Sequence, residues 1–573
     1  MASKNLHFDR EQLEESGGIV DICQRNDRVE ADLANKLKLS ERLDFATFSG
    51  LNDRDYPCLK TLHADGIHEF RVSRHLPVPS EIVDQFSHMQ CNCEMGLLPR
   101  LRRAWLAVDN DLYVWNYETG SDLAYLTQPT TILRVAVANP KAASVKPHIQ
   151  FILVIATATD IALYAVNFLD LDGKAASEAC DVVSCEMHVM PEALFRVSTD
   201  GSLVQHVECT RDGRIFYGTN DGSLCEIEYS EGGWFSRQCK KINHSKNFLS
   251  FLMPSMLSFG EDDALEQLVT DESRHILYSR SQSGRLQVFD LGSSGRECSR
   301  VAQLQSTAVE HAARAVCPNV DPANFSAIVH MAPIEATQSH CLNLLATTAH
   351  GVRFYFSCYT GDFYDRVRYA HQQQPVQHDV TAIHQQSPTP FSMLRVRQST
   401  ARPVTLRLVH VRLPPGFTAG STVHRPVNVG VVAADDDTTL FLSRADDKSD
   451  YVLALSGASF AGAPDLTETM QQLYVRGGGN SWACHAHEPL TRESLENKAG
   501  TSATTGDSLV PAVRPPLIVH QHSQRNKQFV AITPKSIQTI ERVRPVEILR
   551  EILANYGAES AELRTWAMML NVR

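Results

Sequence analysis

The chain has 573 residues, with 54 Lys and Arg against 66 Asp and Glu, and its formal net charge at pH 7 is -12. A protein that lives on nucleic-acid phosphates needs a basic face, and this charge balance argues against that class. The length exceeds what one hydrophobic core fills, so we expect two domains or one repeat architecture with an appendage.

Residues 1–79 are charged and weakly periodic, with a helical pattern only near residues 28–39. We expect a flank that is partly disordered or helical and that ends at Leu76–Pro79, a segment with two prolines. The first ten residues contain no apolar stretch, so no secretory signal is expected. The 14 cysteines are then expected to be reduced thiols rather than a disulfide framework.

A pattern of two apolar runs around a short polar turn recurs along residues 80–543. Strand-forming residues on both sides of Asp, Asn, Ser or Gly are the signature of a β-hairpin. One hairpin in each four-stranded blade predicts an all-β fold, a seven-bladed β-propeller with long, irregular blades. Two β-sandwiches are the alternative. The hairpins are expected at residues 104–115, 152–166, 214–224, 275–289, 342–356, 429–442 and 529–540.

The most apolar stretch, Phe151–Phe168, is just long enough to suggest a membrane span. It carries Asp160 at its centre, which costs about 2.5–3.5 kcal/mol on insertion scales. Two buried strands that turn at Thr159 and Asp160 explain the stretch better.

Two inserts are expected to be disordered loops hung from blades. Tyr369–Ser392 is rich in Gln and His, and Thr491–Pro515 is rich in Ser, Thr, Gly and Asn.

Residues 544–573 change to a helical period. Pro545 suits the first turn of a helix, and Val546, Leu549 and Leu553 share one face. The pattern repeats after Gly557. We therefore predict a helical hairpin that begins an α-helical solenoid. The second helix presents Leu563, Trp566, Ala567 and Leu570.

The segment Asn243–Phe259 is the most informative stretch for function. At about 100° per residue its bulky apolar side chains fall on one broad face, opposite a stripe of small uncharged residues that includes Ser250 and Ser258. Such a helix binds packing defects in curved lipid rather than headgroup charge. Pro254 interrupts the helix, and a loop helix packed against its own propeller is the alternative.

Other motifs give weak signals for chemistry. Gly506–Leu509 matches a short lipase-esterase signature around Ser508, but it lies in a low-complexity loop without a matching Asp and His downstream. Cys91–Cys93 and Cys484–His487 lack the paired spacing of a zinc finger, and no glycine-rich phosphate loop is present. We expect no enzymatic activity, no metal, no cofactor and no small-molecule substrate.

Several runs, in order from about Leu76 to Pro545, resemble the large inner-ring scaffold nucleoporins of the nuclear pore complex. They are His88–Gly96, Arg103–Leu106, Val114–Glu118, Gly233–Ser236, Lys241–Lys246, Leu408–Phe417 and Arg544–Val546.

The resemblance implies a seven-bladed propeller over residues 80–543, followed by an α-solenoid of which residues 544–573 are the first hairpin. It implies a structural role in the inner ring at the nuclear envelope, in pore assembly and in nucleocytoplasmic transport. Implied partners are other inner-ring and linker nucleoporins, an integral pore-membrane protein and the curved membrane itself, without direct nucleic-acid binding. Nearly the whole solenoid is absent from this chain, and the Gln/His-rich insert has no match in the family.

The resemblance also implies that Asn243–Phe259 senses the membrane. The residues expected to enter it are Phe248, Leu249, Phe251, Leu252, Met253, Met256, Leu257 and Phe259.

Two hypotheses from other classes stay open at this point. One is a cytosolic propeller adaptor that binds peptide motifs and has no pore role, and the other is a hydrolase that uses Ser508. An adaptor has no reason to expose an amphipathic loop, so the behaviour of Asn243–Phe259 discriminates between the first of these and the pore scaffold.

Overall fold

Strands dominate the computed structural model, which confirms the predicted all-β class. The helix expected near residues 28–39 and both Gln/His-rich and Ser/Thr-rich inserts lie outside the residues that the structure describes. Described are residues 46–50, 56, 68–141, 144–146, 148–169, 182–231, 237–245, 263–339, 342–359, 402–416, 427–435, 437–446, 449–457, 468–475, 481–487, 521 and 526–572.

Within these residues the strands form seven sheets, each named here from its first to its last strand in hydrogen-bonded order. The first sheet contains β3 (Cys93–Leu98), β4 (Arg103–Val108), β5 (Asp111–Asn116) and β6 (Ala124–Thr127). The second contains β7 (Ile132–Ala138), β8 (Phe151–Thr157), β9 (Asp160–Leu169) and β10 (Glu186–Val189), and β11 (Phe195–Ser198) also pairs with β9. The third contains β12 (Val204–Cys209), β13 (Ile215–Thr219), β14 (Leu224–Glu231) and β15 (Arg237–Asn243).

The fourth and fifth sheets are β16 (Leu265–Asp271), β17 (Ile276–Ser281), β18 (Leu286–Asp290) and β19 (Ser299–Leu304); and β20 (Ile328–Pro333), β21 (Leu344–Thr348), β22 (Arg353–Ser357), β23 (Arg407–Arg412) and the parallel β1 (Thr47–Ser49). The last two are β24 (Val429–Asp435), β25 (Thr438–Asp446), β26 (Ser449–Gly457) and β27 (Glu468–Tyr474); and β28 (Ala483–His487), β29 (Gln528–Ile532), β30 (Ser536–Arg542) and β2 (Phe70–Pro77).

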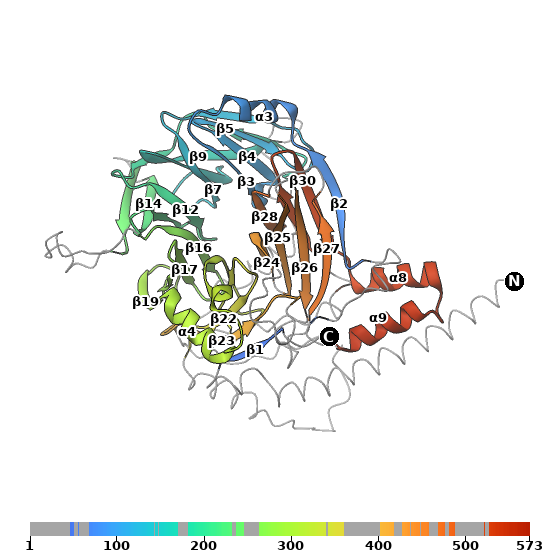
Figure 1. Ribbon diagram of the computed structural model, residues 1–573. Coiled ribbons are helices and arrows are strands. Elements are labelled where there is room, and N and C mark those ends of the chain that lie inside the picture. Colours follow the sequence, from blue (N-terminus) through green and yellow to red (C-terminus); the bar gives the residue numbers. More distant parts are fainter. Residues whose placement is uncertain are drawn as a thin grey trace, which may run out of the picture.

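The sheets are the blades of a propeller. Their first strands contact one another in the order β3, β7, β12, β16, β20, β24, β28, and β28 closes the ring on β3 (Figure 1). Each of the seven predicted hairpins lies in a different blade, so the predicted propeller is confirmed. The stretch Phe151–Phe168 is the hairpin of β8 and β9. Among the described helices, none has the length and apolar character to cross a membrane.

The inner strands are tied to one another by side chains as well as by packing. Neutral His206 on β12 accepts a hydrogen bond from the Leu268 N–H of β16 at 3.3 Å, and Glu208 accepts one from the Thr270 N–H at 3.0 Å. Burial lowers the pKa of His206 to about 3 and raises that of Glu208 to about 8. Both side chains therefore act as uncharged acceptors around the centre of the ring at neutral pH.

The seventh blade joins the two ends of the propeller sequence. Its outer strand β2 pairs antiparallel with β30, from Phe70 opposite Arg542 to Pro77 opposite Ser536. The sequence assigned residues 1–79 to a flank outside the propeller, and β2 corrects that boundary. Its partner strand is more than 450 residues away along the chain, which no local pattern reveals. β1, from the same flank, extends the fifth blade.

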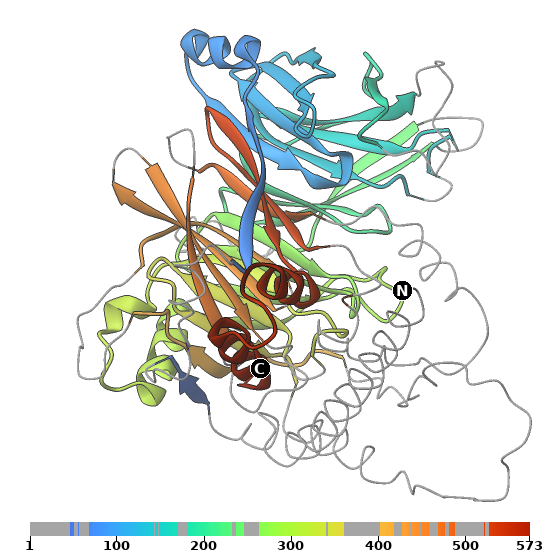
Figure 2. The same ribbon diagram turned by 90° about the vertical axis from the view of Figure 1, so that its right-hand side faces the viewer.

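Two helices follow the last blade, as predicted: α8 (Pro545–Tyr556) and α9 (Ala561–Val572). They pack on each other outside the ring of sheets (Figures 1 and 2). The face of α8 that packs is offset by one residue from the face that carries Val546, Leu549 and Leu553. Ile548 and Ile552 pack with Val543, whereas Leu553 is 42% exposed.

Short helices cover parts of the sheets: α3 (Ser80–Gln85), η2 (Phe86–His88), η3 (Pro99–Leu101), α4 (Ser306–Val316) and η6 (Pro322–Phe325). One cysteine departs from the expectation that all are reduced thiols. Nine described cysteines are free, whereas Cys185 is in a disulfide.

Candidate functional site

The residues expected to contact a membrane all lie within residues 246–262, outside the described part of the chain. The structure describes both ends of this segment, which connects β15, the outer strand of the third blade, to β16, the inner strand of the fourth. We call residues 243–245 and 263–265 the loop base. The loop base determines where the predicted membrane-contacting residues leave the propeller.

The first half of the loop base continues the sheet of the third blade. Asn243 pairs with Cys225, and the His244 N–H donates to the Leu224 carbonyl at 2.8 Å. The Ser245 hydroxyl accepts a hydrogen bond from the Leu224 N–H at 2.7 Å. The chain therefore leaves this blade from a fixed position beside β14.

A buried ion pair lies beneath this end of the loop base. Glu226 accepts hydrogen bonds from Arg214 Nε at 2.8 Å and Nη2 at 2.7 Å, and it contacts His244 Nε2 at 2.9 Å. Burial opposes ionisation of Glu226, but the bonds from Arg214 and His244 outweigh it and lower the pKa to about 2. Arg214 also donates to the Gly295 and Glu297 carbonyls of the fourth blade at 2.7 Å each. This pair therefore joins the two blades between which the loop runs.

The second half of the loop base is held by Asp263. Its carboxylate accepts hydrogen bonds from the Ser283 N–H at 2.9 Å and hydroxyl at 2.8 Å, and it pairs with Arg285 at 3.2 Å. Partial burial raises the pKa of Asp263, but the Ser281 side chain, the bonds from Ser283 and the charge of Arg285 outweigh it and lower the pKa. The Asp263 carbonyl lies against Gly222 of the third blade, where φ is +76° and a Cβ would stand 2.8 Å from that oxygen. Glycine is thus required for this close approach.

The charges near the loop base are balanced. Lys240 pairs with Glu228 at 2.7 Å and Lys241 with Asp200 at 2.6 Å, both on the exposed surface. A polybasic patch binds anionic headgroups by charge. The described surroundings of the loop present paired lysines instead of such a patch.

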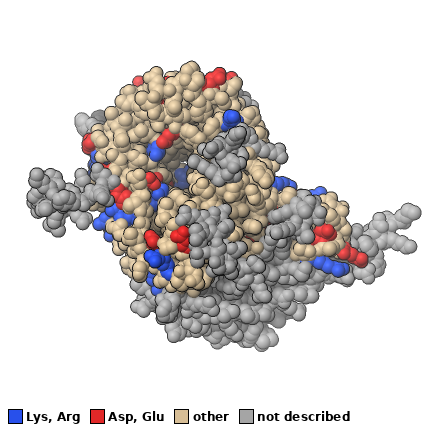
Figure 3. Space-filling view, viewed as in Figure 1, with Lys and Arg blue, Asp and Glu red and all other residues tan. Residues whose placement is uncertain are grey.

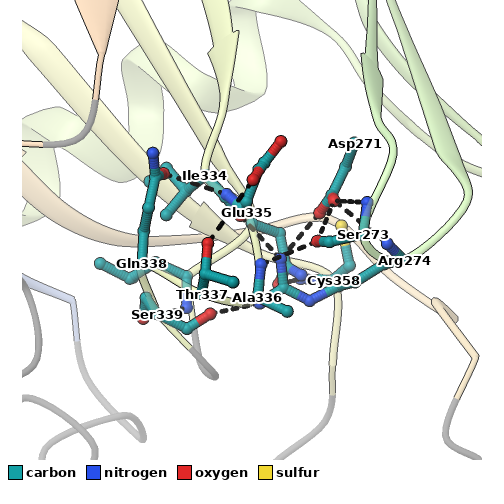
Figure 4. A network of polar contacts seen from close by, with 12 residues as sticks. Asp271, Ser273, Arg274, Ile334, Glu335, Ala336, Thr337, Gln338, Ser339 and Cys358 are labelled. Carbon is teal, nitrogen blue, oxygen red and sulfur yellow. Dashed lines mark hydrogen bonds and ion pairs between the residues drawn. The ribbon is translucent and has the colours of Figure 1, made fainter. Parts of the chain in front are cut away.

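One polar cluster contains Ser, Asp and Cys side chains of the kinds that hydrolases use, but its contacts hold the fold together (Figure 4). The Ser273 hydroxyl donates to Asp271 and accepts from the Ala336 N–H at 2.8 Å. Arg274 Nη1 bonds Asp271 and the Ile334 carbonyl, at 2.7 Å each. The bonds with Asp271 hold the turn between β16 and β17 in shape, and the bonds with Ala336 and Ile334 tie that turn to the fifth blade. The Cys358 thiol nearby is buried, and burial raises its pKa to about 12, so it is not a thiolate nucleophile.

The other chemical motifs are dispersed. Gly506–Leu509, with Ser508, lies outside the described residues. Cys484 is buried in the core of the sixth and seventh blades, and His487 contacts Glu118 at 3.3 Å. In the part of the chain that the structure describes, no three His, Cys, Asp or Glu side chains are arranged to hold a metal ion.

The sequence did not reveal the residues of the loop base. The ion pair beneath the loop base was not predicted either: Arg214 comes just before β13, Glu226 lies on β14 beyond the predicted hairpin at residues 214–224, and their contact depends on the register of β13 on β14. Asp263 follows Glu261 and Asp262 in the sequence, and nothing local shows that it binds Ser283 and Arg285. The pair Asp221-Gly222 predicts a turn, but the sequence does not show that the Asp263 carbonyl lies against this turn.

Comparisons with known proteins agree on one family. The family model described as "Nup133 N terminal like", named Nucleoporin_N, matches residues 69–482. "Nuclear pore complex protein Nup154" of Drosophila melanogaster is 29% identical over 535 residues, which are 92% of this chain and 36% of that protein. "Nucleoporin NUP170" of Chaetomium thermophilum is 30% identical over 300 residues, 50% of this chain and 20% of that protein. The chain thus matches about a third or less of the length of these relatives.

A solved structure shares the fold. The N-terminal domain of Chaetomium thermophilum Nup170, in its complex with Nup53, superposes with a TM-score of 0.67 at 20% identity. The match covers 95% of this chain and 71% of that one. It supports the propeller independently of the strand pairing described above.

Proposed function

The chain belongs to the Nup133 N-terminal-like family of nucleoporins, and we propose from this that it is a structural propeller of the nuclear pore scaffold, located in the inner ring at the nuclear envelope. The observation that carries the proposal is the family match over residues 69–482, which takes in the first four blades and the sixth, the fifth apart from β1, and strand β2 of the seventh. In this role the chain supports pore assembly and nucleocytoplasmic transport. Its chemistry is binding, since the family consists of structural nucleoporins.

The proposed partners are other inner-ring and linker nucleoporins and an integral pore-membrane protein. The relative of known structure was solved with Nup53, which supports a nucleoporin partner for this propeller. We also propose that residues 70–543 form the propeller unit and that residues 544–573 begin a helical solenoid. The exposed Leu553 on α8 gives a further helix an apolar surface to cover.

The loop at residues 246–262 is the proposed membrane contact. Its apolar side chains, including Phe248 and Leu252, enter the interface of curved lipid, and Ser250 and Ser258 stay at headgroup level. The anchored loop base supports this role, because a loop held at both ends by two blades presents its residues from a fixed place on the propeller.

The energetics predict weak binding by a single copy. Burying a Phe or Leu contributes about 1.5–3 kcal/mol, while ordering each backbone position costs about 1–2 kcal/mol. A few buried side chains therefore offset the ordering of the loop only in part, and strong binding needs many copies held in a ring.

Replacing Phe248 and Leu252 together by Asp is expected to abolish flotation with small liposomes. Wild-type binding should fall as vesicle diameter grows, because larger vesicles have fewer packing defects, and it should change little with salt, because the surrounding lysines are paired. Flotation across vesicle sizes and salt concentrations measures both effects.

A matched variant with Ser250→Asn and Ser258→Asn changes only the polar stripe and should float like the wild type. All three proteins must show the same melting curve. Equal flotation of the Asp variant and the wild type, or binding that vanishes with salt, would contradict the membrane contact.

A further inference from the structure

An exposed apolar patch lies where the seventh and first blades meet. α3, η2 and the residue after them carry Val83, Phe86 and Met89, and Trp482 stands just before β28. Val83, Met89 and Trp482 are 40%, 51% and 37% exposed. The Phe86 and Trp482 rings meet edge to face with centroids 6.4 Å apart, so side chains from two blades form one surface. We call these four residues the α3 patch.

The backbone beneath the α3 patch is fixed. Ile82 is fully buried in the core between the two blades, and the Gln85 side chain accepts a hydrogen bond from the Tyr113 hydroxyl at 3.0 Å. Asp109 accepts bonds from three successive backbone N–H groups, those of residues 90–92, at 2.7–2.8 Å. These bonds lower the pKa of Asp109, which is therefore charged at neutral pH. A partner that binds here does not have to order this segment, which reduces the cost of association.

The composition of the patch is that of a protein interface. Isolated exposed apolar residues are normal on soluble proteins. The Phe86–Trp482 pair, with exposed Met89 three residues after Phe86, instead has the composition that is enriched at the centres of interfaces, where such residues supply most of the binding energy.

The rim of the patch is acidic. Glu81 and Asp84 are exposed on α3, and acidic atoms lie over this helix at the top of the molecule (Figure 3). Basic groups on neighbouring elements are Arg74 and His75 of β2, of which Arg74 is paired with Glu118, His88 of η2, and Lys535 in the turn between β29 and β30. Two carboxylates beside the apolar centre oppose an anionic membrane surface and favour a partner with basic flanks.

We propose that the α3 patch binds a short peptide segment of a partner protein, in which bulky apolar residues are flanked by Lys or Arg. The patch lies on the same face of the propeller as the loop base, since both occupy connections from an outer strand to the next inner strand. In a ring of antiparallel four-stranded blades these connections all emerge on one face. A segment bound here would therefore reach the face from which the 246–262 loop leaves.

Selection of random dodecapeptides displayed on phage, with the purified chain as bait, tests this proposal. Selected peptides should combine bulky apolar residues with Lys or Arg, and their affinity should fall at least tenfold in a Met89→Ala/Trp482→Ala variant. A Glu81→Lys/Asp84→Lys variant should weaken these peptides and bind better to counterparts in which Asp or Glu replaces the basic flanks.

A control variant, Val404→Ala/Tyr474→Ala, removes exposed apolar side chains on other blades and should bind like the wild type. The Phe248→Asp/Leu252→Asp variant should also bind peptides normally, so a failure of the membrane loop does not affect this result. The proposal is overturned if no peptide is enriched, if the Met89 and Trp482 variant binds equally well, or if charge reversal has no effect. It is also overturned if that variant loses binding to phosphatidylcholine–phosphatidylserine vesicles and keeps its peptides, because the patch would then be a lipid contact.

Discussion

Replacing Glu468 by Gln is expected to lower the free energy of unfolding by about 3–5 kcal/mol, the cost of leaving buried charge without its partner. Glu468 on β27 accepts a hydrogen bond from Arg353 Nη1 at 2.7 Å and one from Arg412 Nε at 3.2 Å. Both arginines belong to the fifth blade and are almost fully buried. Without the carboxylate, two buried guanidinium groups lose their negatively charged partner. The contact between the fifth and sixth blades is then weaker.

The same carboxylate makes stability depend on pH. Burial opposes ionisation of Glu468, but Arg353 and Arg412 outweigh it and lower its pKa. Its contribution is present above the ordinary carboxyl pKa and is lost as the pH falls towards the lowered one. Urea unfolding at neutral and acidic pH measures both effects, and the gap between wild type and variant should narrow in acid.

Glu228→Gln is the matched control. Glu228 pairs with Lys240 on the exposed surface, so its loss should change stability by less than about 1 kcal/mol. If the Glu468 and Glu228 variants unfold at the same urea concentration, the buried network does not hold the two blades together.

A chain that begins at Ser80 is expected to be largely insoluble, whereas a chain that begins at His68 should stay monomeric. The first lacks β2, which pairs with β30 along its whole length and buries Phe70. Gln471 of the sixth blade bonds both the N–H and the carbonyl of Phe70, at 2.8 and 2.6 Å. Removing β2 leaves β30 as an open edge that can pair with other chains. Both chains lack β1 and Tyr56, so the comparison isolates β2.

Soluble yield and size-exclusion profiles of the two chains measure this effect. Equal yields of monomer would show that the ring does not depend on closure by β2. The residue ranges matter here, because a boundary placed after residue 79 from the sequence alone would produce the defective chain.

The sequence predicted what is local in this fold. Each hairpin has its two strands and its turn within about fifteen residues, so alternation and turn residues suffice to find it. β2 was missed because its partner strand comes from the far end of the chain, and its own sequence, with Arg71 and Arg74, looks like a solvated flank.

The packed face of α8 shows a second limit of prediction from sequence. Ile548 and Leu549 are neighbours, as are Ile552 and Leu553, so two overlapping apolar faces fit the same helix. Which face turns inward depends on Val543, where the last strand ends, and on α9. The loop base and the ion pair beneath it are a third case, since Arg214 meets Glu226 only through strand register, and Asp263 meets Gly222 only because two blades adjoin.

The position of the fluorescently tagged 573-residue chain in cells shows whether it is part of the pore scaffold. A structural propeller of the pore scaffold should give a punctate nuclear rim that coincides with a pore marker, and the Phe248→Asp/Leu252→Asp variant should weaken the rim signal without unfolding the protein. A folded wild-type chain spread evenly through the cytosol, with no enrichment at the nuclear envelope, would contradict the account.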